Sequence, residues 1–253
     1  MRNWTKIDVR PARRGLSAGR GGARRFRSRE GLAALEFALI APILISMIAG
    51  LYDVTTAFIA WRRVTAAALA IGEIATGEAS STAVGINVLN QTQALAAASA
   101  VYPYLPNLLG GSPPGFGVTL SSIVMTPTPS GCTTACSYTA HVAWSGVFEG
   151  TGTVRPCDTV QGTSVISSVS DTAPPSPATL PQDMFSPAPL LVVDVTYTFQ
   201  PLFFTFITGN IAMAQTSYLS PRAGLITAWV QYYPGGQGDT TGLCAGYPAS
   251  TVS

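Results

Sequence analysis

The chain has few charged residues and a single histidine, and both shortages narrow the kinds of function it can have. Charged residues make up 10% of its 253 residues, and His141 is the only histidine. A hydrolytic triad needs a general base, and no nucleophile motif surrounds His141, which we expect to be a solvated or structural residue on a strand. Glycine-rich phosphate-binding loops of the common types are also absent. We therefore expect no enzyme activity and no cofactor.

Basic residues are scarce everywhere except at the N-terminus. After Val64 there are two, Arg155 and Arg222, against eight acidic residues, so this part of the chain is not expected to bind nucleic acid. Ten of the fourteen Lys and Arg residues lie before residue 30. A basic arm can itself bind nucleic acid, but this one directly precedes an apolar segment, where Lys and Arg hold the flank in the cytoplasm. We predict a basic cytoplasmic leader over residues 1–31 and no nucleic-acid partner.

A long apolar segment over residues 32–61 follows this leader. As a helix it would be about 45 Å long, longer than a hydrocarbon core of about 30 Å, so its ends would enter the interfaces. A cleavable secretory signal is the alternative, but its apolar region is only about 7–15 residues long. We therefore predict a single transmembrane helix in the bacterial inner membrane, with the N-terminus cytoplasmic and residues 62–253 periplasmic.

Two acidic residues and a proline interrupt this segment. A carboxylate costs roughly 2.5–3.5 kcal/mol at mid-membrane and less near an interface, so Glu36 is expected to have a partner or a purpose. Pro42 removes a backbone donor, which predicts a kink or a packing role. Asp53 would lie about 25 Å farther along the helix, near the opposite interface, where we expect a solvated acid.

The residues around Glu36 resemble a known family. The segment reads Arg29-Glu30-Gly31-Leu32-Ala33-Ala34-Leu35-Glu36-Phe37-Ala38-Leu39-Ile40-Ala41-Pro42. This segment resembles TadE-like pilus-assembly proteins in several features together. These are small residues before an acid, the pair Glu-Phe, an apolar run that contains Pro, a later acid, and basic residues after the span. TadE-like pilus-assembly proteins are minor pseudopilins of tight-adherence (Flp-type) pilus systems. The resemblance covers about residues 30–70, with a weaker one at residues 195–203, where a strand ends in a Pro-Leu-hydrophobic turn.

The resemblance implies processing and assembly. A prepilin peptidase would cut after Gly31, so that Leu32 becomes the first residue and Glu36 the fifth, followed by the aromatic Phe37. The new ammonium of Leu32 can pair with Glu36 of a neighbouring subunit, which would set the register of an assembly. The alternative for Glu36 is an acid in the first turn of a helix, stabilised by the helix dipole. With Pro42 and Asp53, these are the expected processing and assembly residues.

Two functions from different classes follow. The first is a membrane-anchored, pseudopilin-like structural component of a tight-adherence pilus system. Its partners would be the inner membrane, other pilus-system subunits and the prepilin peptidase. The second is a single-span anchor for a small periplasmic binding domain unrelated to pili.

All four cysteines, Cys132, Cys136, Cys157 and Cys244, follow the span. In an oxidising periplasm they are expected to form disulfides, and the three pairings that four cysteines allow stay open. A zinc site is the competing hypothesis, but Cys132, Cys136 and His141 lack the usual ligand spacing. We expect no metal.

The remaining sequence predicts an α+β domain in which an antiparallel sheet packs against the long N-terminal helix. That helix should run to about Thr76 and end at Gly77, and a second helix is predicted over residues 84–100. Period-2 alternation and apolar runs predict strands at residues 118–124, 138–145, 191–200, 211–219 and 226–233. The proline-rich residues 171–189 predict a loop.

Overall fold

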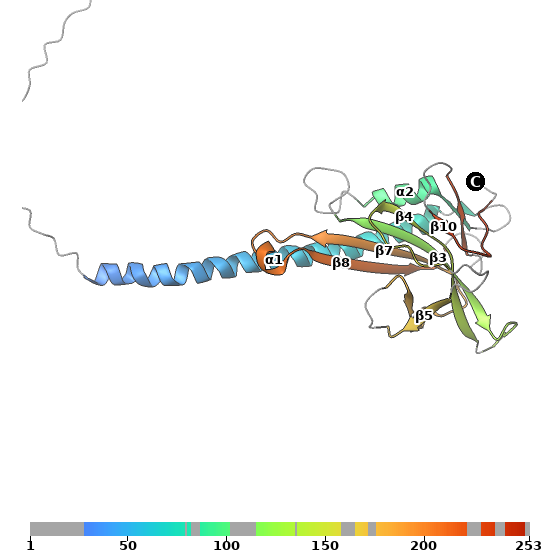
Figure 1. Cartoon of the computed structure of the whole chain (residues 1–253), viewed down its shortest axis with the longest axis horizontal. Helices are drawn as coiled ribbons and strands as arrows, with labels where there is room; N and C mark the ends of the chain where they lie inside the picture. Colours follow the sequence, from blue (N-terminus) through green and yellow to red (C-terminus); the bar gives the residue numbers. More distant parts are fainter. Residues whose placement is uncertain are drawn as a thin grey trace, which may run out of the picture. The chain divides into compact units, whose positions relative to one another are not determined.

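A computed structural model describes residues 28–78, 80–81, 87–101, 115–134, 136–157, 165–171, 176–221, 229–235 and 241–250 (Figure 1). The chain divides into two compact units, Met1–Met47 and Ile48–Ser253, which are described separately. The predicted leader lies outside the described residues up to position 27, and residues 28–31 already belong to a helix.

The first element is a long helix, α1 (Ser28–Glu78), which is rich in Ala, Leu and Ile and has Pro42 inside it. Alanine and leucine are among the strongest helix formers. The helix continues through Gly77 and ends at Glu78, slightly beyond the predicted end. Its part from Ala34 to Gly77 is long and apolar enough to cross a membrane, and the most apolar window has none of its residues buried. The predicted apolar helix is therefore confirmed.

The main sheet confirms the predicted antiparallel strands. Its strand order is β6-β5-β4-β3-β7-β8, with β10 also paired to β4. The four long strands, β3 (Gly117–Thr128), β4 (Ser137–Gly150), β7 (Leu190–Phe199) and β8 (Ile211–Leu219), pair antiparallel. The short strands β5 (Val165–Val169) and β6 (Thr179–Pro181) pair parallel to each other, and β10 spans Gly242–Leu243. The fold class is α+β, as predicted.

A second, smaller sheet contains β1 (Ser80–Ser81), β2 (Asn87–Asn90) and β9 (Val230–Tyr233). The helix predicted over residues 84–100 is wrong in its first part, because β2 precedes a shorter helix, α2 (Gln91–Ser99). The cause is a capping box. Asn90 accepts a hydrogen bond from the backbone N–H of Gln93 at 2.8 Å, and the Gln93 side chain accepts one from Asn90 N–H at 3.0 Å. This reciprocal pair starts the helix after Asn90.

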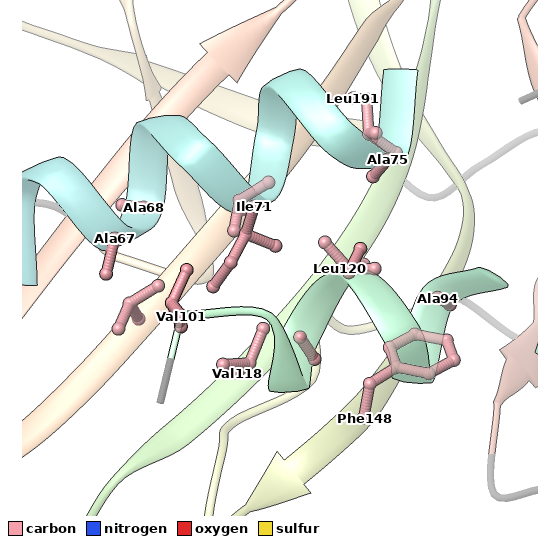
Figure 2. Close-up of a cluster of buried hydrophobic side chains, with 14 of the residues drawn as sticks. Ala67, Ala68, Ile71, Ala75, Ala94, Val101, Val118, Leu120, Phe148 and Leu191 are labelled. Carbon is pink, nitrogen blue, oxygen red and sulfur yellow. The ribbon is translucent and has the colours of Figure 1, made fainter. Parts of the chain in front are cut away.

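The C-terminal part of α1 packs into the core of the second unit. Ala67, Ala68, Ile71 and Ala75 of α1 meet apolar side chains of α2 and the sheet in one buried cluster (Figure 2). Small side chains let the helix approach the strands closely. At Gly72 an added Cβ would lie 2.2 Å from Leu219 Cδ1 of β8. The Ser217 hydroxyl of β8 also donates to the Ala68 carbonyl at 2.8 Å.

A β-bulge changes which face the side chains of β4 occupy. The alternation in the sequence places Ala140, Val142 and Trp144 on one face of the strand. In the structure Trp144 joins the cluster around α1, whereas Ala140 and Val142 join a second cluster. The register explains this, because Ser122 pairs with Trp144 but Ile123 pairs with Val142, which leaves one extra residue on β4. The indole of Trp144 then donates to the Val230 carbonyl at 2.7 Å and joins the two sheets.

The four cysteines form two disulfides, Cys132–Cys136 and Cys157–Cys244. The first closes the connection between β3 and β4, and the second links the chain after β4 to the segment after β10. The loop predicted over residues 171–189 is wrong in part. It contains β6 and a short 3-10 helix, η2 (Gln182–Met184), because Leu180 packs fully buried in the second cluster.

Candidate functional site

In the first unit, α1 presents one carboxylate among exposed apolar side chains. Glu36 is exposed, and Phe37 and Leu39 beside it are 70% and 67% exposed. No hydrogen bond or ion pair to Glu36 occurs among the described residues of this unit. Pro42 is exposed as well, and Gly31 and Leu32 lie in the first turns of the same helix. The candidate processing bond and the candidate assembly acid are thus both on one apolar helix.

In the second unit, Asp53 has a different environment. It is 7% exposed, and its carboxylate accepts three backbone hydrogen bonds from the turn after β7. Leu202 N–H donates to Oδ1 at 2.9 Å, and Phe203 and Phe204 N–H donate to Oδ2 at 3.0 and 2.9 Å. The predicted solvated acid is wrong. Asp53 is a buried clamp that joins α1 to the end of the β7–β8 hairpin.

The local sequence explains why this turn needs a carboxylate. Pro201 lacks an N–H and cannot continue the strand ladder after Phe199. A one-turn helix, α3 (Thr205–Thr208), follows, and the N–H groups at a helix start have no partner within the helix. Asp53 accepts the N–H group of Phe204, the N-cap of α3, together with those of Leu202 and Phe203 in the turn before it. These charge-assisted hydrogen bonds compensate for the burial of the carboxylate. The Gly209 N–H closes the turn on Thr205 O at 2.8 Å.

Aromatic contacts hold the same turn against α1. The Tyr52 and Phe203 rings meet edge to face at a centroid distance of 5.7 Å. The Phe204 ring lies beside Gly50, where an added Cβ would be 3.4 Å from Phe204 Cε2. The sequence marked the Pro-Leu-hydrophobic turn and Asp53 separately. No short stretch of sequence contains both, because Asp53 and Leu202 lie 149 residues apart in the chain.

A second buried charge, Arg155, also escaped the sequence analysis. Its guanidinium pairs with the Asp194 carboxylate through two hydrogen bonds of 3.1 and 3.0 Å. Nη1 donates to the carbonyls of Ser176, Pro177 and Thr179. The sequence feature that could have pointed to this buried ion pair is the scarcity of basic residues, since Arg155 is one of only two after Val64. Arg155 fixes the chain before β6 onto β7, and its partners are all structural.

His141 is structural rather than solvated. It is 8% exposed, and its Nε2 lies 2.9 Å from Thr126 Oγ1 on the neighbouring strand. Burial lowers the pKa of its imidazole below the usual value. Within the described ranges, no group of three or more His, Cys, Asp or Glu residues is arranged to hold a metal ion.

Comparison with known proteins bears on one part of the chain. Residues 31–71 match the model of the TadE-like protein family, whereas no curated protein and no solved structure matches the chain. The matched segment contains Glu36, Phe37, Pro42 and Asp53, and it ends inside the part of α1 that packs into the core. Over this segment the match confirms the resemblance seen in the sequence and supports a TadE-like pilus-assembly protein.

Proposed function

We propose that this chain is a pseudopilin-like structural subunit of a tight-adherence pilus assembly system. In this proposal residues 32–61 anchor it in the inner membrane, residues 1–31 form a cytoplasmic leader and residues 62–253 form a periplasmic domain. The observation that carries the proposal is Glu36, an exposed carboxylate on an apolar helix inside a TadE-like segment. An acid in that setting favours a partner outside its own chain.

Charge and cysteine chemistry support the orientation. Ten basic residues precede the apolar segment and two, Arg62 and Arg63, follow it, so the positive-inside rule favours a cytoplasmic N-terminus. Both disulfides then form in an oxidising compartment, which suits the periplasm.

Processing would create the partner that Glu36 needs. A prepilin peptidase would hydrolyse the Gly31–Leu32 peptide bond, consuming one water and leaving a carboxylate on Gly31 and an ammonium on Leu32. That bond lies near the start of α1, where helix ends fray. The ammonium of one subunit would then pair with Glu36 of the next. Two such charges are far less costly together in an apolar medium than either alone.

The competing function is a single-span anchor for a periplasmic binding domain. The observation that favours it is Asp53, the second acid of the segment, which binds within its own chain and is not available to a partner subunit through its carboxylate. Of the two acids, Glu36 is therefore the one that discriminates the two functions.

The test compares Glu36→Gln with Glu73→Gln, which makes the same chemical change at an exposed position farther along α1. Both variants should reach the membrane fraction, because removing a carboxylate makes insertion easier or leaves it unchanged. Glu36→Gln should lose co-purification with the pilus-system proteins, and Glu73→Gln should retain it. Unchanged co-purification of membrane-inserted Glu36→Gln would leave the simple anchor as the better account.

A further inference from the structure

The end of the β7–β8 hairpin is apolar and uncharged. We call residues 200–210, between the two strands, the hairpin tip. Leu202 and Ile207 are 69% and 65% exposed, and Phe203 is about half exposed. No charged residue occurs between Asp194 and Arg222. Neighbouring exposed apolar side chains without charges mark a surface that contacts something other than water.

Six backbone N–H groups of the hairpin tip, those of residues 202–204 and 207–209, are paired within the chain. Asp53 accepts the N–H groups of residues 202–204. The N–H groups of Ile207 and Thr208 donate to the Phe204 carbonyl at 2.9 and 3.0 Å. The Thr205 and Thr208 hydroxyls donate to the carbonyls of Pro201 and Phe204. An irregular segment can enter an apolar medium only when its backbone groups are paired in this way.

The hairpin tip lies against α1 (Figure 1), where Asp53 accepts its backbone N–H groups. Ile48, Leu51 and Val54, which flank Asp53 on the helix, are each close to 70% exposed. About two turns later along α1 the sequence becomes polar at Arg62 and Arg63, and the Arg62 guanidinium stacks 4.6 Å above the Phe58 ring. Aromatic and basic residues in this order are typical of the passage from hydrocarbon to lipid headgroups.

We propose that the hairpin tip enters the lipid interface of the membrane that α1 spans, and that Asp53 holds it at that depth. This inference rests on the membrane anchor of the proposed function but not on its pilus role. The tip lies at the same level of α1 as the exposed apolar residues Ile48, Leu51 and Val54, so the medium that surrounds the helix at that level also reaches the tip. Lipid also explains why Asp53 is fully paired, since neither the carboxylate nor the free N–H groups would be stable there alone.

The test measures depth with a nitroxide spin label on the full chain in vesicles of phosphatidylethanolamine and phosphatidylglycerol. All four native cysteines are in disulfides, so one added cysteine carries the label. Labels at Leu202→Cys and Ile207→Cys probe the tip, and Val54→Cys provides the reference on α1. Leu95→Cys, on an exposed face of α2, is the aqueous control. The readout is the ratio of collisions with oxygen, which concentrates in lipid, to collisions with a water-soluble nickel complex.

We expect the labels at Leu202 and Ile207 to give the lipid-type ratio of Val54, severalfold above that of Leu95. A water-type ratio at both tip positions, with a lipid-type ratio at Val54, would overturn the inference and leave the anchor intact. Weak collisions with both reagents at the tip would also overturn it, because protein rather than lipid would cover the tip. A water-type ratio at Val54 would instead contradict the membrane anchor itself.

A further variant in the same experiment tests whether Asp53 holds the tip at its depth. Adding Asp53→Asn to the Leu202→Cys chain removes the charge that accepts the backbone N–H groups. The label should then collide more often with the nickel complex, while the label at Val54 stays in lipid. An unchanged ratio at Leu202 would show that Asp53 does not hold the tip at its depth.

Discussion

At the residue scale, the two acids of the apolar segment have opposite environments. Glu36 is exposed on α1, whereas Asp53 is buried and accepts three backbone hydrogen bonds. The cost of a carboxylate in a membrane marked Glu36 as a functional residue, whereas Asp53 was expected to be a solvated acid near the interface. The sequence could not identify the partner of Asp53. That partner is the backbone of a turn, and backbone N–H groups are the same whatever the residue type.

Replacing Asp53 should loosen the hairpin tip. Asp53→Asn keeps the shape of the side chain but loses the charge and one acceptor, and leaving a buried donor unpaired costs roughly 1–3 kcal/mol. The amides of Leu202, Phe203 and Phe204 should exchange hydrogen much faster than in the wild type. Thr55→Ala removes only an exposed bond to the Leu51 carbonyl and should leave this exchange unchanged. Equal protection of the three amides in Asp53→Asn would contradict the clamp.

His141 should make the stability of the domain depend on pH. Burial lowers the pKa of its imidazole in the folded chain, so the unfolded chain binds more protons once the pH falls below about 6.5. Stability is therefore present in full above that pH and decreases as the pH falls toward the folded pKa. We expect thermal unfolding between pH 7.5 and pH 5.5 to show this loss in the wild type and much less of it in His141→Gln. Identical pH dependence in both chains would show that His141 is not responsible.

At the element scale, the predicted strands at residues 118–124, 138–145, 191–200 and 211–219 all correspond to strands of the main sheet, whereas side-chain faces and the start of α2 were predicted wrongly. The alternation over residues 191–200 predicted β7 almost to the residue, because one buried face fixes a period of two. The bulge opposite Ser122 and Ile123 moved Trp144 to the other face. The strand β2 lies within the range that was predicted as a helix, because the capping box of Asn90 and Gln93 places the start of α2 after Asn90. These differences arise from tertiary pairing that no short window of sequence contains.

The two disulfides should differ in what they contribute to stability. Cys157–Cys244 joins residues 87 apart and Cys132–Cys136 joins residues 4 apart. Loop entropy then predicts a stabilisation of about 4.5 kcal/mol for the first and about 2 kcal/mol for the second. Replacing Cys157 and Cys244 together by serine should lower the unfolding temperature more than replacing Cys132 and Cys136. A larger loss from the Cys132 and Cys136 pair would argue that native packing, rather than loop closure, sets their contributions.

At the scale of the whole molecule, the TadE-like segment includes both the exposed apolar part of α1 and a part of α1 that packs into the domain. The TadE-like match covers residues 31–71, from the acid on the exposed helix to the part of α1 buried under the sheet. The sequence predicted this division into an apolar helix and an α+β domain, because membrane length and strand alternation are strong patterns. Residues 80–190, which form most of the sheet, contain no recognisable motif, so the residues that indicate a function lie in the N-terminal segment.

The most direct test of the proposed pseudopilin is the N-terminus of the mature chain. Protein purified from cells that assemble the tight-adherence pilus should begin at Leu32 when its terminus is sequenced. A Gly31→Leu variant should keep the leader, because the bulky side chain blocks cleavage after position 31. A wild-type chain that still begins at Met1 in cells that assemble the pilus would contradict the account, because Glu36 would then have no Leu32 ammonium to pair with.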